Sequence, residues 1–269
     1  MSDLKIAVVG CAGRMGINLL RQIDATEGCR ISGGTERPGS DALGKDIGAV
    51  AGLDDLGIAI TDNADAVIHE ADAVLDFTAA IATVEHARIC ALHGTALIIG
   101  TTGLSDTEDA AILTASEKTA VIRGANMSVG VNLLLGITRK VAAKLGPDWD
   151  IEVVEMHHRR KVDAPSGTAL ALGKAAAEGR DVDHDSVADR CRDGIAGARK
   201  RGDIGYAALR GGNVVGDHTV IFAADDERVE ITHKASDRTI FARGAVTAGL
   251  WSKDKGPGLY DMTEVLDLD

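Results

Sequence analysis

The amino-acid sequence predicts an α/β protein whose first half is a doubly wound parallel sheet. Two observations lead to this prediction. Short apolar runs rich in Val and Ile alternate, up to about residue 126, with longer segments of helical periodicity. Strands that are separated by helices need crossover connections, so neighbouring strands run parallel and helices cover both faces of the sheet.

The first strand is expected at 5–9, an apolar run that ends at a glycine. The segment 14–25 follows, and its apolar residues recur at the three- and four-residue spacing of a helix. Later segments repeat this order, with strands expected at 29–35, 73–77, 96–99 and 119–122 and helices at 84–92 and 105–117. Ligands of such sheets bind beyond the carboxyl ends of the strands, which here are 10–16, 35–37, 77–78, 100–103 and 124–127.

The composition excludes several classes of partner. The chain has 269 residues and a formal net charge of −12, and aromatic residues make up 3% of it. Such a chain lacks the basic surface and the stacking side chains that nucleic acids need, and acidic membranes repel it. The four cysteines form no CxxC pair, the first residues do not read as a signal peptide, and no apolar run reaches membrane length. We therefore expect a cytoplasmic protein with reduced thiols and no nucleic-acid or membrane partner.

The loop between the first strand and the first helix carries glycines at 10, 13 and 16. Glycine lets the backbone approach a pyrophosphate closely, and the following helix offers unpaired N–H groups to the phosphates. A tight strand-to-helix turn without a ligand is the alternative for such a loop taken by itself. Glu36 lies 20 residues after Gly16, where a carboxylate accepts hydrogen bonds from the adenosine ribose. Together these features predict a Rossmann-type dinucleotide site.

Arg37 bears on which dinucleotide is bound. Its guanidinium suits the 2′-phosphate of NADP whereas Glu36 suits NAD, so we predict the use of both NADH and NADPH. A solvated charge pair is the alternative for these two side chains. Two further loops follow strands: Gly100–Gly103 is expected beneath the nicotinamide half of the cofactor, and Gly124–Met127 closes the last strand of this half.

Five consecutive basic or titratable residues, 157–161, are unusual in a chain of net charge −12. A metal site is not expected, because adjacent histidines on a strand point to opposite faces and the neighbouring arginines repel a cation. A solvated surface run is the ordinary interpretation. The following turn favours an anionic ligand, since Ser166 or Thr168 can cap a helix whose N-terminus, opened by Gly167, suits a carboxylate. The run and this helix end together predict a small dicarboxylate substrate.

A reductase of such a substrate also needs proton donors, because hydride delivery leaves negative charge on the substrate. His157 and Lys161 are the candidates, since histidine titrates near neutrality and lysine becomes a better acid when it is desolvated. His158 is a candidate to bind a substrate carboxylate.

Several longer motifs occur together along the chain. They are Gly-Cys-Ala-Gly-Arg-Met-Gly at 10–16, Asp-Phe-Thr at 76–78, Gly-Thr-Thr-Gly at 100–103, Asn-Met-Ser-Val-Gly-Val-Asn at 126–132, Glu-Met-His-His-Arg-Arg-Lys-Val-Asp-Ala-Pro-Ser-Gly-Thr-Ala at 155–169, Ile-Gly-Tyr-Ala-Ala-Leu-Arg at 204–210, Gly-Asp-His-Thr at 216–219 and Glu-Ile-Thr-His-Lys-Ala-Ser at 230–236. In this combination the chain resembles the dihydrodipicolinate reductase family over essentially its full length. The motif at 155–169 is the most specific of them.

The resemblance implies roles for individual residues. The implied cofactor contacts are Gly10, Cys11, Ala12, Gly13, Arg14, Met15, Glu36, Arg37, Gly100, Thr101, Thr102, Gly124, Ala125, Asn126 and Met127. His157 and Lys161 match the proton-transfer residues, and the implied holders of the substrate carboxylates are His158, Gly167, Thr168 and, as a weaker candidate, Arg238. Two positions depart from the family pattern. Met127 stands where many members have Phe, which leaves the nicotinamide contact apolar but less rigid. Ala79 stands where some members have a basic residue, which lowers the expected preference for NADP.

The resemblance also implies a domain organisation and a reaction. A dinucleotide-binding domain would comprise 1–126 and 238–269, and a smaller α+β domain with a mixed sheet, 127–237, would bind substrate and build a homotetramer. The hinges would lie at 124–131 and 234–241, and 181–203 is expected as a long loop. The implied reaction is the reduction of 4-hydroxy-tetrahydrodipicolinate to tetrahydrodipicolinate by NADH or NADPH with loss of water, in lysine and diaminopimelate biosynthesis.

Two other functions are compatible with the glycine loop. An aspartate or homoserine dehydrogenase shares that loop but lacks the motif at 155–169. A non-catalytic NAD-sensing protein has no need of two proton donors such as His157 and Lys161. The complete motif therefore favours the reductase.

Overall fold

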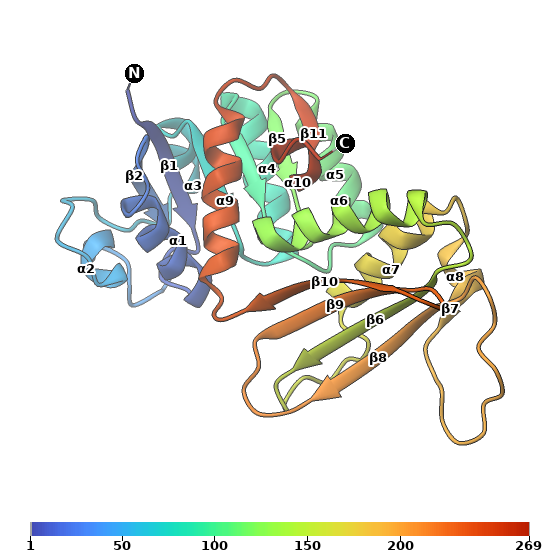
Figure 1. Ribbon diagram of the computed structural model, residues 1–269. Coiled ribbons are helices and arrows are strands. Elements are labelled where there is room, and N and C mark those ends of the chain that lie inside the picture. The colour runs from blue at the N-terminus through green and yellow to red at the C-terminus, as the bar shows by residue number, and fades with distance from the viewer. Residues whose placement is uncertain (1, 269) are drawn as a thin grey trace. The chain divides into compact units, whose positions relative to one another are not determined.

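The computed structural model describes residues 2–268 and divides the chain into two compact units (Figure 1). The first unit comprises Met1–Val129 and Thr239–Asp267, and the second comprises Gly130–Arg238 and Leu268–Asp269. Each unit has its own sheet, and the first has a hydrophobic core on each face of its sheet, whereas the second has one core.

Six parallel strands form the sheet of the first unit. Their bounds are β1 Leu4–Val9, β2 Cys29–Thr35, β3 Ala73–Asp76, β4 Ala96–Ile99, β5 Ala120–Arg123 and β11 Gly258–Tyr260. The order across the sheet is β11-β5-β4-β3-β1-β2, and each neighbouring pair is parallel. The chain therefore winds to one side of β1 and then to the other, which places the topological switch point beside the glycine loop. This arrangement confirms the predicted doubly wound fold class.

Helices cover both faces of this sheet, and alternate strand residues meet different helices. The helices of the unit are α1 Arg14–Asp24, α2 Ile47–Ala51, α3 Ala64–His69, α4 Ala80–His93, α5 Asp106–Ser116, α9 Thr239–Ser252 and α10 Met262–Val265. Ile6 and Val8 of β1 share a core with α1, α9 and α10, whereas Ala7 and Val9 share a core with α3, α4 and α5. Figure 1 shows α1 and α9 on the near face of the sheet. Burial on both faces explains why these strands are unbroken apolar runs.

The second unit holds a mixed sheet with the strand order β10-β9-β6-β8-β7. The strands are β6 Asp150–His157, β7 Ala188–Asp189, β8 Ile204–Arg210, β9 Gly216–Ala223 and β10 Arg228–Ala235, and the helices are α6 Val129–Lys144, α7 Gly167–Gly179 and α8 His184–Val187. Alternate residues of β6 and β9, among them Ile151, Val153 and Phe222, form the core with α6 and α7. The predicted α+β mixed-sheet region is thereby confirmed.

The expectation of a long loop at 181–203 was wrong for residues 184–189. Asp183 caps the short helix α8 by accepting the backbone N–H of Ser186 at 2.9 Å, and β7 pairs in parallel with β8. The rest of the segment contains no helix or strand, but Arg192 and Arg199 tie it to Glu152 of β6 at 2.6 and 2.9 Å. These contacts join residues far apart in the sequence, and composition alone does not reveal them.

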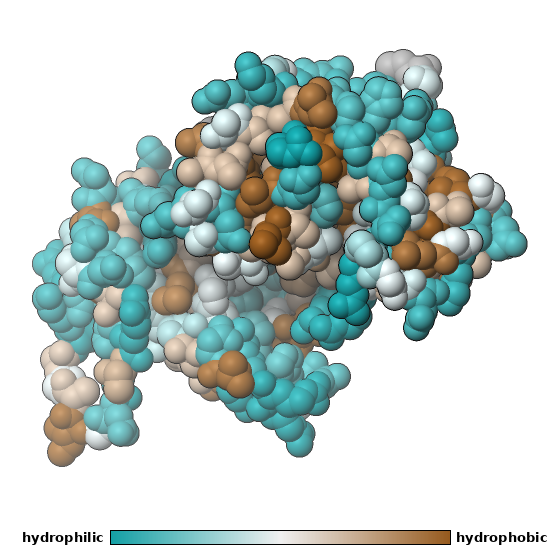
Figure 2. Space-filling model, turned by 180° about the vertical axis from the view of Figure 1, so that it is seen from behind, coloured by the Kyte–Doolittle hydropathy of each residue, from teal (hydrophilic) through white to brown (hydrophobic). Residues whose placement is uncertain are grey.

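Hydrophilic residues cover most of the face seen in Figure 2, and the apolar side chains on it form small separate groups. Within residues 2–268, no helix is both long enough and apolar enough to span a membrane.

Candidate active site

The carboxyl ends of the strands in the first unit surround a cavity of about 510 Å³. Three of the predicted strand ends contribute to it. The lining residues are Gly10, Gly13, Thr35, Glu36, Arg37, Pro38, Asp62, Ala64, Phe77, Thr78, Ala79, Ala82 and His86. The cavity therefore brings the glycine loop together with the acidic and basic residues that follow β2.

The geometry of the glycine loop suits a phosphate group. Gly10 has a φ of +68°, which side-chain-bearing residues rarely adopt, and a Cβ on Gly16 would lie 2.3 Å from the carbonyl oxygen of Gly10. Gly13 is the N-cap of α1, and no side chain caps this helix. The first N–H groups of a helix have no intrahelical acceptor, so those of α1 remain available to an anion. These features fit the pyrophosphate of a dinucleotide.

Glu36 is already engaged with the glycine loop, because its Oε1 accepts the backbone N–H of Ala12 at 2.9 Å. This hydrogen bond fixes the carboxylate at the edge of the cavity. The thiol of Cys11 is fully buried, and the Cys11 N–H donates to the carbonyl oxygen of Thr35 at 3.0 Å. Burial, together with the charge of Glu36, raises the pKa of Cys11 to about 12. Cys11 is therefore a neutral core residue, and its thiol packs away from the cavity.

Asp76 at the end of β3 is a residue whose role sequence reasoning missed. The side chain is fully buried, and it accepts hydrogen bonds from the Thr78 hydroxyl at 2.6 Å and from the ring of His86 at 2.8 Å. It also accepts the backbone N–H of Thr78 and, at 3.4 Å, the hydroxyl of Thr101. Asp76 thus connects two strand ends and the cavity-lining His86. The available signal was a carboxylate that directly follows a buried apolar strand.

The two later loops of the first unit do not line this cavity. Gly100 is required by packing, because a Cβ there would lie 2.0 Å from the ring of Phe77. Met127 is buried in the core and approaches Gly124, whereas Ala125 and Thr102 are exposed. Asn126 orders the turn by accepting the N–H of Ser128 at 2.9 Å.

In the second unit, the face of the sheet that forms the core becomes polar at one end. Along β6 the buried positions are Ile151, Val153, Glu155 and His157. Along β9, Phe222 and Val220 are followed on the same face by His218, which pairs with Glu155 across the strands. The strand periodicity thus continues the apolar core directly into a buried polar cluster.

Glu155 is the centre of this cluster and is 1% exposed. Its Oε2 accepts His157 Nδ1 at 2.6 Å and Arg210 Nη1 at 2.7 Å. Its Oε1 accepts Arg210 Nη2 at 2.7 Å and the backbone N–H of Ser166 at 3.1 Å. Burial alone would raise the pKa of Glu155, but the hydrogen bonds and charges of Arg210 and His157 outweigh it and lower the pKa. An ionised carboxylate only accepts, so His157 carries its proton on Nδ1 and its Nε2 is left for a ligand.

His218 completes the cluster from β9. Its ring lies edge-on to that of His157 with centroids 5.1 Å apart, and its Nε2 is 3.0 Å from the hydroxyl of Ser166. Ser166 is the N-cap of α7 and accepts the N–H of Ala169. Burial lowers the pKa of His218 to about 4, and the nearby charges of His157, His233 and Lys161 act in the same direction while Glu155 opposes them. His218 is therefore neutral at physiological pH.

Several polar atoms near this cluster have no partner within the described part of the chain. The Nδ1 atoms of His158, His218 and His233 are buried and make no hydrogen bond there. Buried polar atoms are rarely left unsatisfied, so unpaired ring nitrogens point to a ligand with polar groups. No heavy atom lies within 4 Å of the position that a Cβ on Gly167 would take, which leaves room at the N-terminus of α7.

The structure divides the basic run at 157–161 into different environments. Arg159 and Arg160 are exposed, as the surface interpretation predicts, and His157 is buried. Lys161 is half-buried, and its Nζ lies 2.8 Å from Asp163. Arg238 is exposed and lies beyond the end of β10.

Glu155, Arg210 and His218 lie within the sequence motifs, but the sequence alone predicted no role for any of them. The signal that could have found them is the alternation of β6 and β9, in which polar residues take positions of the buried face.

Two family models match the chain. The model described as "Dihydrodipicolinate reductase, N-terminus" matches residues 4–127, and "Dihydrodipicolinate reductase, C-terminus" matches residues 130–266. Among curated proteins, the chain is 52% identical over 268 residues to a 4-hydroxy-tetrahydrodipicolinate reductase of Rhodopseudomonas palustris (strain TIE-1), covering 100% of this chain and 99% of that protein. It is also 52% identical, with 100% of both chains covered, to a protein of the same name from Dinoroseobacter shibae.

A solved structure has a similar fold. It is the dipicolinate-bound dihydrodipicolinate reductase from Paenisporosarcina sp. TG-14, with a TM-score of 0.77 and 21% identity, covering 97% of this chain and 98% of that one. A probable dehydrogenase from Thermotoga maritima is more distant, with a TM-score of 0.62 and 11% identity over 98% of this chain and 93% of the other.

Proposed function

The chain belongs to the dihydrodipicolinate reductase family, and from this membership we propose that it reduces 4-hydroxy-tetrahydrodipicolinate to tetrahydrodipicolinate with loss of water. It is an NAD(P)-dependent oxidoreductase of lysine and diaminopimelate biosynthesis. Relatives that match over the full length and the paired family models do not favour an aspartate or homoserine dehydrogenase.

The observation that carries the proposal is the polar cluster on β6 and β9. An ionised Glu155 orients the ring of His157, and unpaired nitrogens of His158 and His233 lie in the same unit. A ligand with two carboxylates would accept hydrogen bonds from these ring nitrogens when they carry the proton, and the open N-terminus of α7 would add backbone N–H groups.

The first unit is assigned to the cofactor, NADH or NADPH, which supplies the hydride when bound. The N–H groups at the start of α1 would hold the pyrophosphate, and Glu36 would face the adenosine ribose. Arg37 lines the same cavity and would meet a 2′-phosphate. The remaining proposed contacts are Gly10, Cys11, Ala12, Gly13, Arg14, Met15, Gly100, Thr101, Thr102, Gly124, Ala125, Asn126 and Met127. For Cys11 the contact would come from the backbone, because the thiol is buried.

In the second unit, His157 and Lys161 are proposed to manage the protons. Hydride addition leaves negative charge on the substrate, and His157 Nε2 and Lys161 Nζ are the groups that would stabilise and neutralise it. Glu155 stabilises positive charge on His157, as a carboxylate partner does for any catalytic imidazole. Asp163 holds the ammonium group of Lys161 at 2.8 Å.

His158, Gly167 and Thr168 are proposed to bind the substrate carboxylates, and Arg238 is retained as a weaker candidate. The unpaired Nδ1 of His158 and the space beside Gly167 support the first two assignments. Among residues 2–268, no hydrogen bond connects Arg238 to the polar cluster, and its role rests on the family resemblance.

We also propose that the second unit builds a homotetramer in the cytoplasm. Leu209 on β8 and Val229 on β10 are exposed apolar side chains on the strands of the mixed sheet, although helices α6 and α7 cover its core face. An exposed apolar sheet surface is suited to an interface between subunits. Light scattering of the purified protein would give the mass, and a monomer at micromolar concentration would contradict this assembly.

The activity is tested by following the oxidation of NADH and of NADPH at 340 nm. The unstable substrate is generated in the cuvette from pyruvate and aspartate semialdehyde by its synthase. Oxidation that depends on the synthase supports the proposal, and the ratio of the two rates gives the cofactor preference. A folded protein that binds NADH but oxidises neither cofactor would contradict it.

A further inference from the structure

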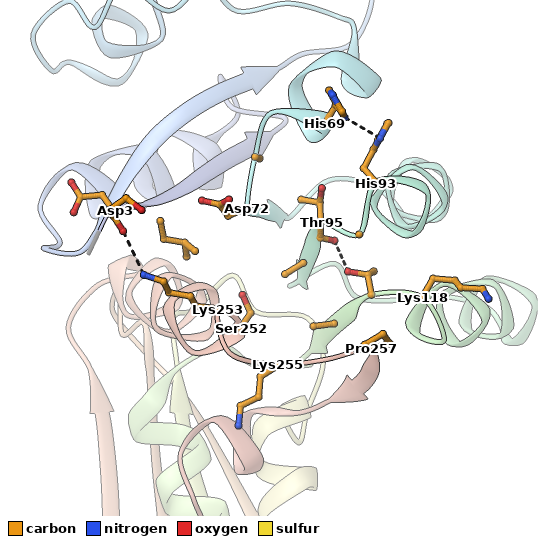
Figure 3. A pocket seen from close by; sticks show the side chains of 17 residues that line it. Asp3, His69, Asp72, His93, Thr95, Lys118, Ser252, Lys253, Lys255 and Pro257 are labelled. Carbon is orange, nitrogen blue, oxygen red and sulfur yellow. Dashed lines mark hydrogen bonds between the residues drawn. The ribbon is translucent and has the colours of Figure 1, made fainter.

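The first unit has a second cavity, of about 480 Å³ (Figure 3). It lies at the amino ends of the parallel strands, whereas the glycine loop lies at their carboxyl ends. It is lined by the first residues of β1, β4 and β5, which are Leu4, Ala96 and Ala120, and by Asp72, which directly precedes β3. Two histidines at its rim take no part in the proposed reaction. His69 is the last residue of α3 and His93 is the last residue of α4.

The two rings face one another through equivalent nitrogens. His69 Nδ1 lies 3.2 Å from His93 Nδ1, and the ring planes are tilted by 59°. Figure 3 shows the two rings meeting on one side of the cavity, whereas Lys118, Lys253 and Lys255 lie on the other. Two imidazole nitrogens bound to one tetrahedral metal ion at ~2.0–2.1 Å lie about 3.3 Å apart. The 3.2 Å separation, at which the two rings share a hydrogen bond, is also close to that of two ligands of one ion, so a metal ion could replace the shared proton with little movement of the rings.

The Nε2 atom of His93, which points away from His69, contacts a carboxylate, as the second nitrogen of a metal-binding histidine commonly does. His93 Nε2 lies 3.0 Å from the carboxylate of Asp65. The carboxylate is an acceptor, so the proton of a neutral His93 is on Nε2 and the lone pair on Nδ1 points toward His69. A carboxylate that accepts the second N–H of a histidine orients the ring and strengthens it as a ligand.

The electrostatic surroundings also favour a cation at this rim. Both histidines are at the carboxyl ends of helices, where unpaired carbonyl groups give a negative potential. Asp65 adds a formal negative charge next to His93. The three lysines oppose a cation, but in Figure 3 they lie across the cavity from the ring pair.

We propose that His69 and His93 form a two-histidine site for a borderline divalent transition-metal ion such as Zn²⁺, with Asp65 as the positioning residue and water in the remaining coordination positions. Imidazole nitrogens suit Zn²⁺, Cu²⁺ and Ni²⁺ and are poor ligands for Mg²⁺ or Ca²⁺. No group of three or more His, Cys, Asp or Glu side chains within residues 2–268 is arranged to hold a metal ion. With two protein ligands the site is an accessory, exchangeable one, unlike the closed four-ligand sites that stabilise folds.

The test is calorimetric titration of the chelator-treated full-length protein with Zn²⁺. We expect the wild type to bind one Zn²⁺ more than His69→Gln and His93→Gln do. Asp65→Asn should weaken the site by at least ~10-fold, because it removes the charge that supports His93. Lys118→Gln is the matched control from the same cavity, and it should bind Zn²⁺ as well as the wild type or better. Histidines of the second unit are present in every variant, so their binding cancels in the comparison.

Co²⁺ gives a second measurement, because its visible absorption changes when protein ligands replace water. Thermal unfolding without metal should be similar in His69→Gln and in the wild type, since His69 is exposed. The proposal is wrong if His69→Gln binds Zn²⁺ as tightly as the wild type, or if Asp65→Asn leaves the affinity unchanged. In that case the ring pair is only a hydrogen bond between two histidines.

Discussion

Replacement of Glu155 by glutamine is the sharpest test of how the polar cluster works. Glutamine keeps the size of the side chain, but its NH₂ group donates and cannot accept. The carboxylate accepts His157, Ser166 N–H and both terminal nitrogens of Arg210, all at 2.6–3.1 Å. The single amide oxygen of glutamine can replace only one of the two carboxylate oxygens as an acceptor. About half of these hydrogen bonds are therefore lost, and Arg210 loses its counter-charge.

The size of the effect follows from burial. Removing one member of a buried ion pair costs about 3–5 kcal/mol of unfolding free energy. Turnover should fall by ~10²-fold or more, because His157 is no longer held with its proton on Nδ1. KM should change much less, since Glu155 itself makes no proposed substrate contact. Glu155→Asp keeps the charge and should recover part of kcat.

The assay is the synthase-coupled oxidation of NADPH, with circular dichroism to show that the variant is folded. The ¹⁵N chemical shifts of the His157 ring report which nitrogen carries the proton. Glu152→Gln is the matched control, because Glu152 lies on the same strand but pairs with Arg192 and Arg199 outside the cluster. A Glu155→Gln variant with normal kcat and unchanged ring shifts would refute the assignment.

Three further outcomes are expected. Lys161→Ala should lower turnover by at least ~10²-fold while NADH binding, measured by fluorescence titration, persists; near-normal turnover would remove Lys161 from the chemistry. Arg37→Ala should weaken NADPH binding more than NADH binding, and equal losses would show that Arg37 does not read the 2′-phosphate. The pKa of His218 is about 4 in the folded state against an ordinary value of 6.5, so the unfolded chain takes up the proton first and stability falls as the pH drops from 6.5 toward 4. The free energy of unfolding should fall by an amount on the order of 3 kcal/mol over this range. Urea unfolding should show this fall in the wild type but not in His218→Asn. The argument would be contradicted if the free energies of the two proteins changed in parallel with pH.

Much of the first unit follows from local pattern. Each of its first five strands was expected within about one residue of its observed bounds, and helix α1 was expected at 14–25 against the observed Arg14–Asp24. These strands are buried on both faces, so nearly every residue in them is apolar or small and the signal is strong. The short strand β11 and the helices α2 and α3 were not expected, because their few residues carry little periodicity.

The family and the reaction were also accessible from the sequence. The motif at 155–169 and its companions predicted the dihydrodipicolinate reductase family, and the family models and relatives confirmed it. A motif records which side chains the chemistry needs, and this information does not depend on knowing where they lie. The assignment of Glu36 and Arg37 to the cofactor, and of His157 and Lys161 to proton transfer, remains a prediction.

The tertiary structure decided which of these side chains act on one another. Glu155 and Arg210 are 55 residues apart, and Ser166 and His218 are 52 apart. Their contacts depend on the register of β6 with β8 and β9, in which a shift of one residue would turn each side chain to the opposite face. The pairing of His69 with His93 likewise depends on how α3 packs beside α4. By itself, the sequence determined the fold class, the family and the list of reactive groups, because these depend on local periodicity and residue type. Pairing, proton position and burial were decided only by the fold, because they depend on distances between residues that the chain separates.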